Sequence, residues 1–124
     1  MAYTVFRQSQ LEWIPRDDES GRTLAGLSDS MTQSRANIWR YDPGAKGRRH
    51  RHKAQEETFI VLSGTLSMYL GEPPERVEVP AGDVIHIQPG TALQSVNHGD
   101  EDLVVFVYGT PPESEQAELL DSAV

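Results

Sequence analysis

The middle of the chain is a series of short β-rich segments separated by glycine and proline at close spacing. Strands of this length between turn residues are typical of an antiparallel sandwich or barrel. Helical periodicity is nearly absent from the same region, so the sequence predicts an all-β fold. The expected strands are Arg35–Tyr41, Glu57–Leu62, Thr65–Leu70, Arg76–Val79, Asp83–Ile87, Leu93–Asn97 and Leu103–Tyr108.

A length of 124 residues is that of one domain. The weaker strand signal before and after the β-rich region suggests three parts. We expect an N-terminal arm over residues 1–33, a barrel over 34–109 and an acidic C-terminal tail over 110–124. Within the arm, Leu11–Pro15 is expected to be an edge strand and Arg16–Arg22 a polar loop. Within the tail, Glu115–Asp121 is expected to form one or two helical turns.

Composition excludes several classes of function. The chain has no cysteine, so disulfides and thiolate metal ligands are both absent. A net charge of −8 argues against a nucleic-acid or anionic membrane surface as partner. No apolar run reaches the roughly eighteen residues of a membrane span, and the N-terminus lacks a leader pattern. We therefore expect a cytoplasmic protein.

The segment with the most chemical information contains His50, His52 and Glu57. On a strand, residues two apart project from the same face about 7 Å apart, so two imidazoles can converge on one ion. A carboxylate from the next strand can complete one side of a coordination sphere. Glu56 and Glu57 both begin an apolar alternation, so strand parity alone leaves open which of them faces inward.

The spacing of this segment resembles the first motif of the cupin superfamily, G-x5-H-x-H-x3,4-E-x6-G. Gly44, His50, His52, Glu57 and Gly64 match every fixed position. The resemblance implies a double-stranded β-helix, also called a jelly roll, with a site at the wide end of the barrel. It also implies that the two histidines and Glu57 are three of four metal ligands, whereas Glu56 points outward.

The second cupin motif, G-x5-P-x-G-x2-H-x3-N, is kept only in part. Gly90 and Asn97 fit its frame, but Gln88 replaces the proline and Leu93 replaces the fourth ligand histidine. Leu93 shares strand parity with Asn97 and should face the cavity, where it offers no lone pair; Gln94 has the opposite parity.

Two interpretations of the incomplete ligand set remain open. A divalent transition metal (Mn, Fe, Ni, Cu or Zn) can be held by two histidines and one carboxylate, as in non-haem iron(II) sites. Alternatively the site is degenerate, and the histidines are hydrogen-bonding groups of a metal-free pocket.

Alternating residues on the expected strands form a candidate pocket wall. Small-ligand pockets commonly combine aromatic walls with a few polar groups. The alternative for the aromatic residues is ordinary core packing. The expected pocket residues are Asn37, Trp39, Tyr41, Phe59, Leu93 and Ser95.

The main hypothesis is a small metal-binding cupin that binds or acts on a small organic molecule, as an oxygenase, isomerase or lyase, without assigned catalytic residues. The alternatives are a metal-free sensor or ligand-binding module and a purely structural dimer. The resemblance further suggests a homodimer formed by sheet packing, with Leu11–Pro15 crossing to the partner.

Other charged and imidazole groups are expected to lie outside the site. His86 alternates with Ile85 and Ile87 and should point away from the pocket, and His98 should be exposed in a turn. Basic residues that alternate with the paired histidines should face outward, as a solvated edge or a surface that meets the acidic tail of another subunit. These are Arg49, Arg51 and Lys53. The tail acids Glu113, Glu115, Glu118 and Asp121 are interpreted as solubilising.

Overall fold

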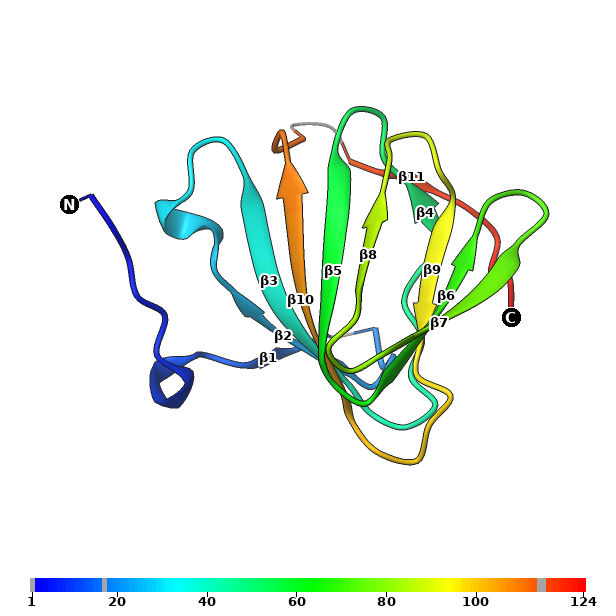
Figure 1. Cartoon of the computed structure of the whole chain (residues 1–124), viewed down its shortest axis with the longest axis horizontal. Coiled ribbons are helices and arrows are strands. Elements are labelled where there is room, and N and C mark those ends of the chain that lie inside the picture. The colour runs from blue at the N-terminus through cyan, green and yellow to red at the C-terminus, as the bar shows by residue number, and fades with distance from the viewer. Residues whose placement is uncertain (1, 17, 114–115) are drawn as a thin grey trace.

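The computed structural model describes residues 2–16, 18–113 and 116–124. Two antiparallel sheets face one another, converge at one end of the molecule and spread apart at the other (Figure 1). The six-stranded sheet has the order β1-β2-β3-β10-β5-β8 and the five-stranded sheet the order β11-β4-β9-β6-β7. Two short 3-10 helices, η1 (Gln8–Gln10) and η2 (Ser28–Ser30), lie near the N-terminus. The strands are β1 (Ile14–Pro15), β2 (Arg22–Gly26), β3 (Arg35–Tyr41), β4 (His50–Arg51), β5 (Glu56–Ser63), β6 (Thr65–Leu70), β7 (Glu75–Pro80), β8 (Val84–Ile87), β9 (Leu93–Val96), β10 (Leu103–Thr110) and β11 (Glu118–Leu119).

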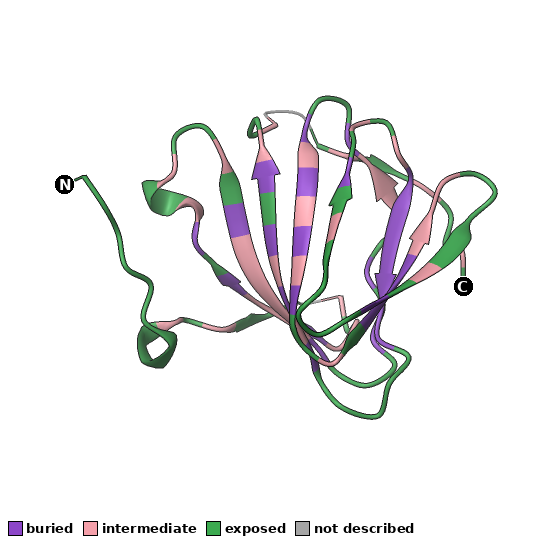
Figure 2. Ribbon diagram, in the orientation of Figure 1, coloured by how far each residue is buried: buried purple, intermediate pink, exposed green. Residues whose placement is uncertain are grey.

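The predicted all-β jelly roll is confirmed, and its strands follow the predicted alternation. Buried residues alternate with partly exposed ones along β5 and β10, which are neighbours in the larger sheet (Figure 2). The inward residues of both sheets form one apolar core, as expected when each sheet buries one face. Its most deeply buried side chains include Val61, Leu66, Met68, Leu103 and Val105.

The β5–β6 turn depends on a glycine. Gly64 has a φ of +78°, which L side chains rarely adopt. A Cβ on Gly64 would also lie only 2.7 Å from the carbonyl oxygen of Asp102. Both the backbone conformation and this close approach therefore require glycine where the chain reverses between the two sheets.

Both ends of the chain contain strands that the sequence did not predict. The expected polar loop ends in β2, which pairs with β3 so that Arg22 lies opposite Tyr41. The prediction of helical turns over Glu115–Asp121 is wrong for residues 116–121. Glu115 lies outside the described residues. There β11 pairs with β4, and the Leu120 N–H donates to the Arg49 carbonyl oxygen at 2.8 Å. Pairing with an open strand edge thus outweighs the helical propensity of this short segment.

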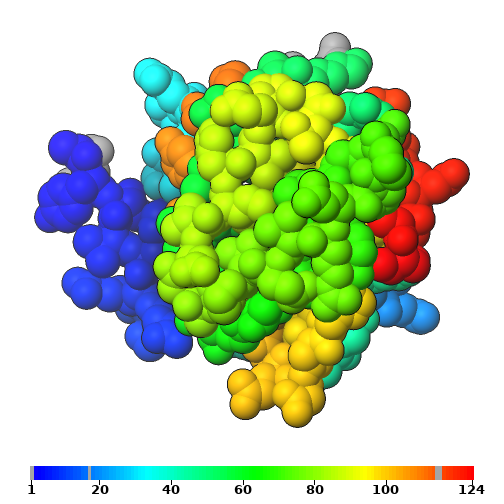
Figure 3. Space-filling view, turned by 45° about the vertical axis from the view of Figure 1, so that its right-hand side comes forward, coloured from blue at the N-terminus to red at the C-terminus, as the bar shows by residue number. Residues whose placement is uncertain are grey.

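The N-terminal arm adds the edge strand β1 to the larger sheet. Ile14 and Pro15 pair with Leu24 and Thr23 of the same chain, and the preceding residues stand out from the side of the barrel (blue in Figure 3). The crossing to a second copy and the homodimer both stay predictions. Across the described residues, no helix has the length and apolar character to span a membrane.

Candidate metal centre

Two consecutive strand segments bring His50, His52 and Glu57 together. His50 lies on β4, His52 directly follows this strand, and Glu57 lies at the start of β5. Each side chain offers one ligand atom, and these atoms lie within 4.8 Å of one another. Glu57 Oε1 is 2.9 Å from His52 Nε2 and 3.8 Å from His50 Nε2. The imidazole rings are 5.0 Å apart and nearly perpendicular.

The second nitrogen of each imidazole is held by the protein. His50 Nδ1 lies 2.9 Å from the Arg48 carbonyl oxygen, and His52 Nδ1 lies 3.0 Å from Glu113 Oε2. A carbonyl or carboxylate oxygen can only accept, so in both rings Nδ1–H is the donor. The lone pair of the neutral ring is then on Nε2, which faces the common centre. Such outer contacts orient metal-binding histidines.

The buried donor atoms at this centre fit a metal ion. The side chains of His52 and Glu57 are only 8% and 6% exposed. Although His52 Nε2 and Glu57 Oε1 lie close together, neither has a hydrogen-bond partner among the described residues. Unpaired buried polar atoms are rare in native proteins and call for an explanation such as an ion. Imidazole nitrogen and carboxylate oxygen are both common ligands of first-row divalent metals.

The ionisation of Glu57 also suits this role. Burial alone would raise its pKa, but the contacts with His50 and His52 outweigh burial and lower the pKa to about 2. The Glu57 carboxylate in turn raises the pKa of His52, and Glu113 adds to this effect. Glu57 is therefore a carboxylate at neutral pH, as ligation requires, and a proton and a metal compete for His52.

Glu113 is a residue of the candidate site that the sequence analysis missed, because its side chain is buried and contacts His52 instead of lying free on the surface as a solubilising tail acid. Besides His52, its carboxylate accepts hydrogen bonds from the backbone N–H groups of Ala54 and Gln55. Burial would raise the pKa of Glu113, but these contacts hold it at about 2. Glu113 therefore links the end of the barrel to the loop that carries His52.

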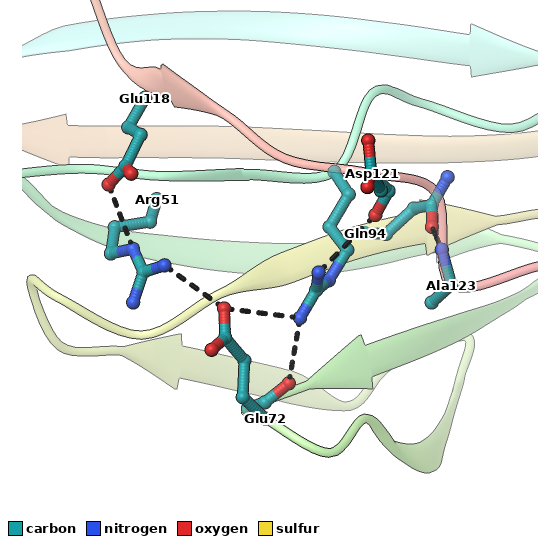
Figure 4. Close-up of polar contacts among 8 residues, drawn as sticks. Arg51, Glu72, Gln94, Glu118, Asp121 and Ala123 are labelled. Carbon is teal, nitrogen blue, oxygen red and sulfur yellow. Dashed lines mark hydrogen bonds and ion pairs between the residues drawn. The ribbon is translucent and has the colours of Figure 1, made fainter.

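The acidic tail meets the basic run within the same chain, whereas the expected contact with the tail of another subunit stays a prediction. Arg51 Nε donates to Glu118 at 3.1 Å, and Arg51 also pairs with Glu72 (Figure 4). Arg49 donates to the Asp121 carbonyl oxygen at 3.3 Å. Both arginines lie on the outer side of the five-stranded sheet, where they hold the tail beside β4.

Gln94, on the neighbouring strand β9, also binds the tail instead of the site. Its side-chain oxygen accepts the Ala123 N–H at 2.8 Å (Figure 4), and its nitrogen donates to the Gly47 carbonyl oxygen at 2.9 Å. The Gln94 side chain is therefore engaged by the tail and by Gly47.

A cavity of about 510 Å³ adjoins the three candidate ligands. The Tyr41 and Ser95 hydroxyls are hydrogen-bonded at 2.6 Å, and the rings of Trp39 and Tyr41 meet edge to face. Trp39 and Tyr41 thus belong to the cavity wall and also pack with the core. All six predicted pocket residues line the cavity: Asn37, Trp39, Tyr41, Phe59, Leu93 and Ser95.

Leu93 lies directly opposite His50 in the pairing of β4 with β9 and is 2% exposed. A buried apolar side chain therefore lies beside His50. Glu56 and His86 lie 3.3 Å apart on the outer face of the larger sheet. His98 is exposed and contacts the Tyr69 hydroxyl at 2.9 Å.

Comparison with known proteins agrees with this geometry. Residues 37–109 match the family model of the cupin domain. The chain is 35% identical over 102 residues to auxin-binding protein 1 of Arabidopsis thaliana. This match covers 75% of this chain but only 48% of that protein, so the chain spans about half the length of that relative. It is 34% identical over 110 residues to an uncharacterized protein of Streptomyces coelicolor, covering 89% of this chain and 98% of that protein.

Among solved structures, the chain resembles a crystal structure described as a sugar phosphate isomerase from a cupin superfamily of Silicibacter pomeroyi. The TM-score is 0.76 at 25% sequence identity, and the match covers 88% of this chain and 76% of that one. The family match covers more than half of the chain, and the Streptomyces relative matches over nearly its full length. The chain belongs to the cupin domain family.

Proposed function

We propose that this cupin binds a divalent transition metal through His50, His52 and Glu57, and that the metal faces a cavity for a small organic molecule. The observation that carries the proposal is the convergence of three ligand atoms, two of them buried, within 4.8 Å of one another. When Nδ1 carries the proton of His52, Nε2 and Glu57 Oε1 are two acceptors only 2.9 Å apart. An unsatisfied buried polar group costs about 1–3 kcal/mol, which a bound cation would offset. The nitrogen and oxygen ligands suit Mn, Fe, Ni, Cu and Zn alike.

A bound metal would supply Lewis acidity or an open position for oxygen. The chain itself would contribute orientation and exclusion of water. Glu113 fixes the His52 ring, and Phe59 and Leu93 form an apolar wall beside the ligands. The Silicibacter pomeroyi protein, described as a sugar phosphate isomerase, supports a small organic molecule as substrate. Oxygenase, isomerase and lyase reactions all remain within the proposal.

Metal content tests this function directly. We expect the purified protein, loaded with each metal in turn and then dialysed, to retain about one equivalent of at least one metal. His52→Ala should retain less than about a tenth, because it removes a ligand. His86→Ala is the matched control, since His86 lies on the outer face. If the unchanged protein retains under about a tenth of an equivalent of every metal, the metal-free ligand-binding module is favoured.

We also propose that a second copy of the chain covers the outer face of the six-stranded sheet. The register aligns Phe106 with Ile38 and Ile60, and Ile60 with Val84, which makes a continuous apolar row across four strands. Val84 is 56% exposed at the end of this row. Contiguous apolar surface of this kind typically marks an interaction site.

Light scattering tests the dimer. The unchanged chain is expected to have twice the mass of 13.8 kDa, and Val84→Asp should shift the mass toward the monomer because it places a charge in the apolar row. Val5→Asp is the matched control, since Val5 is similarly exposed, at 54%, but lies in the N-terminal arm. A monomeric mass for the unchanged chain would refute the proposal.

A further inference from the structure

One wall of the cavity contains a buried arginine that the metal centre does not use. Arg22, the first residue of β2, is 8% exposed, and its guanidinium stacks over Trp39 and Tyr41, 5.0 and 5.7 Å from the ring centres. Nε donates to Ser20 Oγ at 2.9 Å and Nη2 to Asp18 Oδ2 at 3.1 Å. Nη1 has no hydrogen-bond partner among the described residues. A preoriented guanidinium thus keeps one nitrogen available beside the cavity.

Three polar groups surround the point where Gly47 lacks a side chain. A Cβ on Gly47 would lie 2.9 Å from Ser95 Oγ, 3.2 Å from the Tyr41 hydroxyl and 3.3 Å from Arg22 Nη1. The backbone of Gly47 is not in the left-handed region, so its conformation does not require glycine. The absence of a side chain lets Arg22 Nη1 and the two hydroxyls come together close to the Gly47 backbone at the cavity wall. A guanidinium and hydroxyls are groups that bind an anionic oxygen.

The charge of the cavity wall is opposite to that of the whole chain. The lining residues include four arginines, Arg16, Arg22, Arg35 and Arg48, against the two acids Glu57 and Glu113. Both acids are engaged with the histidines, whereas the chain as a whole has a net charge of −8. A cleft lined by one sign of charge concentrates ligands of the other sign. Three of the arginines precede residue 37, outside the matched cupin domain.

We propose that the ligand of this cavity is a small organic anion whose carboxylate or phosphate group accepts hydrogen bonds from Arg22 Nη1 and from the Tyr41–Ser95 pair. One hydroxyl of this pair donates to the other, which leaves one hydroxyl proton for the anion. Arginine binds both groups through directed N–H donors. The position of the rest of the ligand rests on the proposed metal centre. Ser95 is two residues from Leu93 on one face of β9, about 7 Å along the strand, and Leu93 lies opposite His50. An anion at Arg22 thus directs its remaining atoms toward the metal centre.

Calorimetric titration with benzoate, phenyl phosphate and benzamide tests the inference, because the probes share an aromatic body and differ in their polar group. At least one anion should bind the metal-loaded protein at least about tenfold more tightly than neutral benzamide, the range of a charge-assisted hydrogen bond. The tighter of the two anions identifies carboxylate or phosphate as the preferred group. Equal affinity for all three probes would overturn the inference.

Variants locate the contact. Arg22→Gln should lower the affinity for the preferred anion at least about tenfold and leave the affinity for benzamide unchanged. Arg40→Gln is the matched control, since Arg40 stacks over Trp13 at 4.4 Å on strand β3 but does not line the cavity. Gly47→Ala places a methyl group against Ser95, Tyr41 and Arg22 without removing a charge, and it should also lower the affinity for the anion. Thermal unfolding of each variant shows whether it is folded, and equal affinities for Arg22→Gln and Arg40→Gln would refute the contact.

The same titrations on chelator-treated protein separate this inference from the metal proposal. If Arg22→Gln lowers the affinity for the anion in the metal-free protein too, the result supports the Arg22 site, even if the protein never retains a metal. An anion that binds only in the presence of metal and is insensitive to Arg22→Gln must bind the metal itself. That result would overturn the Arg22 site and leave the metal centre standing.

Discussion

Leu93→His is expected to raise the affinity of the chain for a divalent metal by at least about a hundredfold, because loss of even an outer-shell partner typically costs 10–100-fold. Position 93 lies opposite His50 and is buried beside the cavity. An imidazole there would supply the fourth ligand next to His50, His52 and Glu57. Isothermal titration with Zn²⁺ and Mn²⁺, compared between the unchanged chain and the variant, measures the gain.

The same substitution should destabilise the metal-free protein by about 1–3 kcal/mol, because a polar ring replaces a buried apolar side chain. Metal should then restore the midpoint of thermal unfolding. Leu66→His is the matched control, since Leu66 is also fully buried but lies in the core and does not line the cavity. It should be destabilised without rescue by metal. An unchanged affinity in Leu93→His would mean that an imidazole at this position does not reach the centre.

The part of the site that the sequence predicted is local. His50, His52 and Glu57 lie within eight positions of one another, and one reversal of the chain brings them together. Strand parity left Glu56 and Glu57 equivalent, and only the resemblance favoured Glu57. The structure separates them physically, because Glu57 is buried beside the histidines and Glu56 contacts His86 on the outer face.

The sequence predicted that both histidines lie on one strand, but only His50 does. β4 contains only His50 and Arg51, so His52 lies beyond its end. The regular projection of alternate strand residues therefore does not by itself place both rings. The Glu113 carboxylate fixes the ring of His52 instead, and this contact spans 61 positions along the chain.

The residues that were missed come from the two ends of the chain. Arg22 follows a polar stretch without alternation, and nothing in that pattern indicates a buried guanidinium. Its burial depends on the ion pair with Asp18 and on stacking over Trp39. Contacts between distant segments, made by polar side chains, leave no periodic signal, because periodicity reports only which face of an element is apolar.

Glu113→Ala should weaken metal binding by about 10–100-fold, the usual effect of losing the partner of a ligating histidine. The His52 ring would lose the acceptor for Nδ1–H, and the N–H groups of Ala54 and Gln55 would lose theirs. The loop that carries His52 should therefore loosen. Zinc titration measures the first effect, and amide hydrogen exchange at Ala54 and Gln55 measures the second.

Acid should reproduce the loosening in the unchanged chain. The pKa of Glu113 in the folded protein is about 2, below its ordinary value of 4.5. A carboxyl group with a lowered pKa stabilises the fold fully above the ordinary value and progressively less as the pH falls toward the lowered one. Hydrogen exchange at Ala54, corrected for the intrinsic pH dependence, should thus show protection that is constant above pH 4.5 and declines toward pH 2.

Glu118→Ala separates the role of Glu113 from a general effect of the tail. Glu118 also lies in the tail and binds Arg51, but on the outer side of the five-stranded sheet. Its loss removes one exposed ion pair, which is worth at most about 1 kcal/mol. Metal affinity should therefore stay unchanged in Glu118→Ala and fall in Glu113→Ala. Equal metal affinities in the two variants would show that the carboxylate at His52 does not tune the site, because Glu113 contacts His52 and Glu118 contacts Arg51.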